Sequence, residues 1–199
     1  MRARLCIALV TACAACAAAA CGNDGARPPD RDPTTPTDLA PGRRIKRLTA
    51  DQFARSLQVA TGQTWSRYAT YAGALGKADW SEITEEGVDI GVTFDKLVTD
   101  AARETCGRAV NATDQAILRY ATAADRPGVD GADAKILANL KYLMLRFLGE
   151  DISADDDPRL APWLGLLHGG TPPATDAAMR QRWVAVCIGL VTHPDFLTY

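Results

Sequence analysis

The chain has 199 residues, of which 47% are hydrophobic and 23% are charged, with 22 Lys and Arg against 24 Asp and Glu. This slightly acidic balance gives no electrostatic reason to expect a nucleic-acid partner, which would need a basic surface. Residues 43–199 are enough for one domain with a substantial core and too few for two.

The first twenty residues have the features of an export signal. Arg2 and Arg4 supply positive charge, and residues 5–20 form an uncharged, Ala-rich stretch that ends in small residues. This stretch is shorter and less apolar than the roughly twenty residues of a membrane-spanning helix, and polar residues 22–24 follow it directly. We therefore predict that residues 1–20 are a signal peptide, which is removed from the mature chain.

Cys21 follows this stretch, directly after Ala19 and Ala20. Small residues before a cysteine at this place resemble the lipobox of bacterial lipoprotein precursors, although Ala18 stands where that pattern usually has a large aliphatic residue. The resemblance implies that Cys21 becomes the first residue of the mature protein and carries fatty-acyl groups such as palmitate, which together hold a protein stably on a membrane. Two alternatives stay open: ordinary signal cleavage nearby, and lipidation at Cys13, which fits the pattern better but follows too short an apolar run.

Gly22 is the second residue of this predicted mature chain. An Asp there would resemble a signal for retention in the inner membrane, so the resemblance favours the outer membrane. Residues 21–42 contain five of the eleven prolines, with Leu39 as their one large apolar residue. Such a segment buries too little surface to offset its chain entropy, and we predict a disordered tether ahead of the folded domain.

The first helix of residues 43–199 is predicted to begin after Leu48. Thr49 can cap its N-terminus while Gln52 completes a capping box, and apolar residues continue at helical spacing to Gly62. The basic residues 43–47 directly precede it. They can contact anionic lipid or simply stand in solvent ahead of the helix, and we favour the second interpretation.

Trp65, Tyr68 and Tyr71 lie in a long irregular stretch that runs to Gly91. Aromatic side chains in such a stretch can line a binding groove. They can also cover a small helical core, which we consider the better interpretation. These three residues are the possible binding surface that the sequence suggests.

Four further helices are indicated by apolar residues that recur every three or four positions. Their expected bounds are 93–106, 130–148, 158–168 and 176–192. Gly149 is placed to end one of them, and Asp157 and Thr175 are placed to cap the two that follow. No run alternates with period two, so the sequence predicts a single compact all-α domain of about five helices.

Cys106 and Cys187 are the cysteines that remain once the leader is removed and Cys21 carries lipid. Two such residues most often pair in an oxidising envelope, and in the entropy model a disulfide between them adds about 4 to 5 kcal/mol. Two buried free thiols are the alternative. Cys13 and Cys16 lie in the leader and lack the following His of a haem motif, so no cofactor is expected.

The sequence identifies no catalytic residue and no metal ligand. His168 and His193 are its two histidines, and closely spaced ligand pairs of the kind that bind zinc are missing. The acidic residues in 150–157 lack the order and glycine placement of a calcium loop, and we interpret them as a solvated linker that caps the next helix. Nucleophile-elbow and phosphate-binding glycine motifs are also missing.

Two stretches of this chain, residues 43–53 and 183–197, have short motifs in common with other proteins. They are similar to an Arg-Arg-Leu-Thr-x-x-Glu-Tyr opening and a Ser-Pro-Glu-Phe-Leu-like ending in a large family of uncharacterised bacterial secreted proteins. Many members of that family are fused to c-type haem modules. This chain lacks Cys-x-x-Cys-His, so the resemblance implies no haem of its own and carries over no functional residue.

These features favour a membrane-anchored lipoprotein of the cell envelope that acts as a non-catalytic binding or assembly module for an unknown envelope protein. Two alternatives stay open. One is an enzyme of unfamiliar type that uses an Asp or Glu together with His168 or His193. The other is an accessory to an envelope electron-transfer partner, which the resemblance alone suggests.

Overall fold

The computed structural model describes residues 46–77, 91–113 and 115–198. The chain divides into two units, residues 1–42 and 43–199, and every described residue belongs to the second. The predicted signal peptide, the lipidation site at Cys21 and the tether therefore lie outside the described residues. The account below concerns the second unit.

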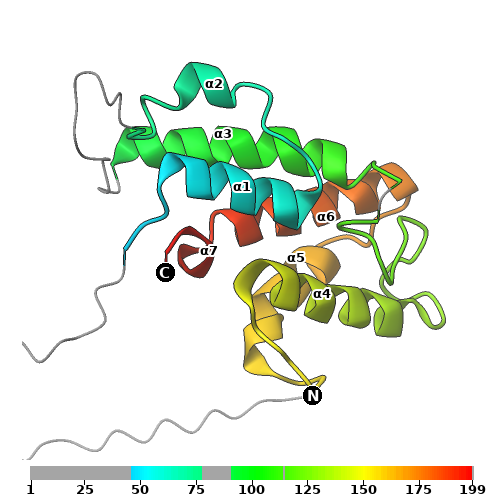
Figure 1. Cartoon of the computed structure of the whole chain (residues 1–199). Coiled ribbons are helices and arrows are strands. Elements are labelled where there is room, and N and C mark those ends of the chain that lie inside the picture. Colours follow the sequence, from blue (N-terminus) through cyan, green and yellow to red (C-terminus); the bar gives the residue numbers. More distant parts are fainter. Residues whose placement is uncertain (1–45, 78–90, 114, 199) are drawn as a thin grey trace, which may run out of the picture. The chain divides into compact units, whose positions relative to one another are not determined.

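The described part of the chain is helical, which confirms the predicted all-α class (Figure 1). Two of its helices, each of four residues, come in addition to the predicted ones. The elements are α1 Ala50–Thr61, α2 Tyr68–Tyr71, α3 Val92–Ala109, α4 Ala132–Leu148, the 3₁₀-helix η1 Pro158–Leu160, α5 Ala161–His168, α6 Asp176–Val191 and α7 Pro194–Leu197.

The helix ends are set by the residues that the sequence indicated. Thr49 and Gln52 make both hydrogen bonds of a capping box at the start of α1. The side chains of Asp157 and Thr175 each accept a backbone N–H in the first turn of η1 and α6. Gly149 ends α4 in the left-handed conformation, with φ of 70°. These caps satisfy backbone groups that a helix end leaves without partners.

Helix α6 is the centre of the core. It packs against α3, α4 and α5, while α1 packs on α3. Figure 1 shows α1 and α3 on one side of α6, and α4 and α5 on the other. The indole of Trp183, on α6, is fully buried. Other large, fully buried side chains come from α1, α4, α5 and α6 and include Phe53, Leu57, Ile136, Leu140, Leu143, Leu167, Met179 and Leu190.

Cys106 on α3 and Cys187 on α6 form a disulfide across this core. Both residues are fully buried. The structure thus contains the predicted bridge and not the two free thiols. Since the two cysteines are 81 residues apart, the bond joins distant parts of the chain at the most extensive helix pair of the domain.

The connection between α3 and α4 is organised by Asn139, which is fully buried on α4. Its amide nitrogen donates to the carbonyl of Ile117 at 3.0 Å. Its amide oxygen accepts the backbone N–H groups of Arg119 at 2.8 Å and Tyr120 at 3.0 Å. One side chain therefore supplies partners to three backbone groups of a segment that has no regular structure, a role that the sequence analysis did not anticipate.

Arg47 corrects the interpretation of the basic residues ahead of α1 as solvated. Its side chain is buried at the edge of the hydrophobic core, and the residue is only 4% exposed. The guanidinium lies 3.9 Å from the ring centre of Phe94 and donates to the carbonyl of Leu75 at 3.3 Å. A cation over an aromatic face with a carbonyl partner compensates for the lost hydration. Residues 43–45 lie outside the described residues.

Candidate functional site

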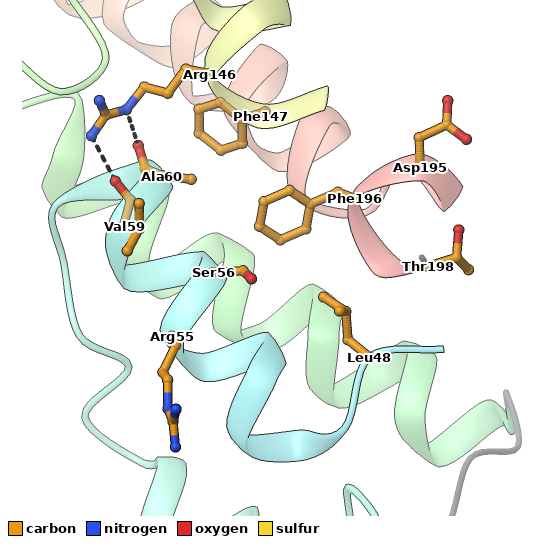
Figure 2. Close-up of a pocket in the computed structure, with 10 residues that line it drawn as sticks. All are labelled: Leu48, Arg55, Ser56, Val59, Ala60, Arg146, Phe147, Asp195, Phe196 and Thr198. Atoms are coloured by element: carbon orange, nitrogen blue, oxygen red, sulfur yellow. Dashed lines mark hydrogen bonds between the residues drawn. The ribbon is translucent and has the colours of Figure 1, made fainter. Parts of the chain in front are cut away.

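A groove opens between α1, the end of α4 and α7 (Figure 2). We call it the α1–α7 groove. Its cavity volume is about 390 Å³, which is within the range of ligand pockets. It is lined by Leu48, Arg55, Ser56, Val59, Ala60, Arg146, Phe147, Asp195, Phe196 and Thr198.

Two backbone contacts bring the ends of the domain together at this groove. The N–H of Leu48 donates to the carbonyl of Leu197 at 2.8 Å. Next to it, Arg47 and Thr198 form an isolated antiparallel bridge. Residues 47–48, ahead of α1, and residues 197–198, at the end of α7, thereby become neighbours, although about 150 positions separate them in the sequence.

The groove has an apolar floor. The rings of Phe147 and Phe196 face each other with their centres 5.8 Å apart, and Leu48 and Ser56 lie on the α1 side (Figure 2). Both phenylalanines are buried. Val59 stands at the rim with 72% of its surface exposed. The groove therefore offers aromatic and aliphatic contact surface to whatever enters it.

Two arginines and one aspartate line its rim. Arg146 Nε donates to the carbonyl of Ala60 at 2.7 Å and Nη2 donates to that of Val59 at 2.6 Å, so this cation caps the C-terminal end of α1 (Figure 2). Arg55 is exposed and makes no hydrogen bond or ion pair with any residue that the structure describes. Asp195 also lines the groove and adds one carboxylate to its rim. The rim therefore carries two guanidinium groups, those of Arg146 and Arg55, and one carboxylate.

Val59 and Phe196 are site residues that the sequence analysis missed. Val59 lies on the solvent side of α1, next to Gln58 and one turn after Arg55, and an apolar residue on the polar face of an amphipathic helix is the signal that could have identified it. Phe196 carries no such signal, because its place at the groove depends on how α7 folds back beside α1.

The aromatic residues Trp65, Tyr68 and Tyr71 form one cluster. Trp65 is 5% exposed, and its ring stacks on that of Tyr71 with centres 5.9 Å apart and an angle of 13°. The Trp65 and Tyr68 ring centres are 6.4 Å apart. Trp65 belongs to the hydrophobic core, and both tyrosines pack against it. This arrangement agrees with the interpretation that the three residues cover the core.

A smaller cavity of about 260 Å³ lies between this cluster and α1. Trp65 and Tyr68 line it, together with Asp51 and residues of α1, while Tyr71 is not among the lining residues. The Tyr68 hydroxyl donates to the Asp51 carboxylate, and Lys77 Nζ lies 3.1 Å from the same carboxylate. These two hydrogen bonds, that of Tyr68 first, lower the pKa of Asp51. The polar groups here serve to join α2 to α1.

The two histidines belong to different parts of the fold. His168 ends α5, with Nε2 3.9 Å from the carboxylate of Asp133. His193 precedes α7, where Nδ1 accepts the backbone N–H of Asp195 at 3.3 Å. Each histidine thus faces its own carboxylate. Among the residues that the structure describes, no three His, Cys, Asp or Glu side chains are grouped so that they could hold a metal ion.

Comparison with known proteins yields no matching protein family, no matching curated protein and no matching solved structure. Within the described ranges, no helix combines the length and the apolar character needed to cross a membrane. Function is therefore inferred from the groove and from the sequence features that accompany it.

Proposed function

We propose that this chain is an envelope lipoprotein, anchored through Cys21 to the outer membrane, whose helical domain holds an apolar segment of another envelope protein in the α1–α7 groove. The exposed Val59 beside the Phe147–Phe196 floor carries the proposal. An apolar groove with a polar rim is typical of protein interaction sites.

The groove also specifies the chemistry of the segment. Its apolar floor suits one aromatic or large aliphatic side chain, inserted between Val59 and Phe196, as the anchor of the contact. Arg55 is available to pair with a carboxylate that flanks this anchor, and Arg146 adds to the positive potential. We therefore expect an acidic residue near the bulky apolar residue of the partner.

The disulfide supports the location. A Cys106–Cys187 bridge forms and persists in oxidising compartments, to which the predicted signal peptide would deliver the chain. The anchor itself rests on the lipobox-like residues around Cys21.

Site-specific photo-crosslinking in intact cells tests the groove. A photoreactive amino acid replaces Val59 in one strain, and replaces Val129, which is 53% exposed and outside the groove, in a control strain. We expect one protein to be captured from Val59 and not from Val129. Arg55→Glu should abolish that capture, whereas the same charge reversal at Arg103, an exposed position on α3, should leave it unchanged.

Two results would contradict the groove proposal: the same proteins captured from both positions, or capture at Val59 that Arg55→Glu does not affect. The captured protein should also contain an acidic residue beside the crosslinked apolar residue, which mass spectrometry of the crosslinked peptide can show.

Metabolic labelling with palmitate tests the anchor separately. The parent chain should incorporate the label and Cys21→Ser should not. Label that stays on the Cys21→Ser variant would place the acylated cysteine elsewhere.

A further inference from the structure

A third cavity lies between the end of α4, helix α5 and the junction of α6 with α7. We call it the α4–α5 pocket. Its volume is about 430 Å³. It is lined by Met144, Leu148, Glu150, Arg159, Pro162, Trp163 and His193, so it combines apolar walls with a few polar groups, as small-molecule sites do.

The end of α4 places Glu150 at the mouth of this pocket. Gly149 takes the left-handed conformation, and its N–H donates to the carbonyl of Leu145 at 3.1 Å. The next N–H, that of Glu150, turns back to the carbonyl of Met144 at 3.3 Å. The chain is thereby reversed over the last turn of the helix, which is why residues from both sides of Gly149 line the same pocket.

The walls of the pocket are aromatic and closely packed. Trp163 is 8% exposed, and its ring centre lies 6.2 Å from that of His193. Behind Trp163 the chain has Gly189, where a Cβ atom would lie 2.8 Å from the indole ring. The missing side chain at Gly189 thus allows the indole to lie against α6. Met144 is buried at the same wall.

The guanidinium at the mouth is already occupied by carboxylates. Arg159 Nη1 donates to Glu150 at 3.2 Å, while Nε and Nη2 donate to the two oxygens of Asp157 at 3.0 and 2.7 Å. These bonds lower the pKa of Asp157 from 3.8 to about 2 and raise the pKa of Arg159. An incoming anion would have to compete with two carboxylates that Arg159 already holds, whereas a cation at Glu150 would compete with one hydrogen bond, from Arg159 Nη1 to Glu150 Oε2 at 3.2 Å.

The surrounding segment is acidic as well. Residues 150–157 carry five carboxylates, and the cations that pair with them are Arg159 and Lys141, whose Nζ lies 2.6 Å from Asp155. The local field is therefore negative, which attracts cations and repels anions.

We propose that the α4–α5 pocket binds a small organic cation with an apolar body, its ammonium group at the Glu150 carboxylate and its body against Trp163. The Glu150 side chain is 27% exposed, so an ammonium group can reach it without full desolvation of the carboxylate. An aromatic wall suits such a cation, both through apolar contact and through the ring quadrupole. This site is separate from the α1–α7 groove, and its ligand does not depend on the partner proposed there.

Methionine methyl resonances provide a direct readout. Once Met1 leaves with the leader, Met144 and Met179 are the two methionines of the chain. Met144 lines the pocket, and Met179 is fully buried outside it. The probe is phenethylammonium, added to the processed chain, with its predicted lipid, in a nonionic detergent. Phenylacetate, of similar size and opposite charge, is the matched control.

We expect phenethylammonium to shift the Met144 signal saturably while the Met179 signal stays in place, and phenylacetate to shift neither. Glu150→Gln should weaken the binding about tenfold, because a charge-assisted hydrogen bond is lost while the shape is kept. Asp155→Asn removes an exposed charge of the same acidic segment outside the pocket, and should change the binding by less than about twofold.

Any of three results would overturn the proposal. They are an unmoved Met144 signal, equal saturable binding of the cation and the anion, and binding that Glu150→Gln leaves unchanged. The unchanged Met179 signal in each variant shows that the core is intact, so a loss of binding cannot be attributed to unfolding.

Discussion

Replacing both cysteines of the Cys106–Cys187 disulfide with alanine tests what holds the helical domain together. The bond joins α3 to α6, and its two residues are fully buried. The substitution removes one sulfur atom from each site, so the packing loss is small. The main effect is on the unfolded chain, which the bond restricts in the parent and not in the double variant.

The size of that effect follows from the 81 residues between the two cysteines. In the loop-entropy model, closing such a loop stabilises the folded state by about 4.5 kcal/mol at 25 °C. The whole free energy of unfolding of a domain is about 5 to 15 kcal/mol. The double variant should therefore lose between a third and most of its stability.

Urea unfolding followed by circular dichroism measures the loss. We expect the free energy of unfolding of Cys106→Ala/Cys187→Ala to be about 4 to 5 kcal/mol below that of the oxidised parent, with a larger m-value because the unfolded chain is more expanded. The parent unfolded and refolded in a thiol reductant should match the variant. A loss of less than about 1 kcal/mol would refute the reasoning, and a parent insensitive to reductant would show that the bond is not formed.

Three further predictions concern local features of the fold. Asn139→Ala should lower the free energy of unfolding by about 3 kcal/mol, because one buried and two half-buried backbone groups lose their partner, and a change below about 1 kcal/mol would contradict this role. Gly149→Ala should lower the free energy of unfolding, measured by thermal denaturation, by about 1 kcal/mol, because an L side chain is strained at a φ of 70°. Gly165→Ala within α5 should leave that free energy unchanged or raise it. Equal effects of the two substitutions would contradict the role of Gly149 as a left-handed cap. Hydrogen bonds from Arg159 lower the pKa of Asp157, so the stability that Asp157 contributes is complete above pH 3.8 and is lost as the pH falls toward about 2. Asp157→Asn should make the free energy of unfolding depend less steeply on pH in that window. A slope identical to that of the parent would show that the Asp157–Arg159 pair does not contribute to stability.

The features that the sequence predicted well are those that neighbouring residues determine. The capping box of Thr49 and Gln52, the N-cap of Thr175 and the left-handed Gly149 each depend on residues within one turn of a helix end. The apolar spacing of each long helix depends on the helical period alone. The disulfide could be predicted for another reason, since only two cysteines remain outside the predicted leader and the lipid site.

The errors and omissions concern residues whose partners are distant in sequence. Arg47 was predicted to be a solvent-exposed basic residue, because its neighbours in sequence do not indicate that Phe94 and Leu75 are its partners. Asn139 looked like an ordinary helical residue because the backbone groups that it holds lie about 20 positions earlier. In each case the side chain is buried and its hydrogen-bond partners are distant in sequence, which only the packed structure can arrange.

The sequence by itself indicated an all-α domain, its cap residues and the pairing of its two remaining cysteines, and it supplied the predicted export signal and Cys21 anchor. The tertiary structure decided where the groove and the pocket lie. The α1–α7 groove exists because Leu48 bonds to Leu197 and Phe147 meets Phe196, and the α4–α5 pocket exists because Gly149 reverses the chain toward Arg159 and Trp163. Local patterns specify which face of a helix is apolar, but a cavity is formed by several elements, and their mutual placement depends on the packing of the whole core.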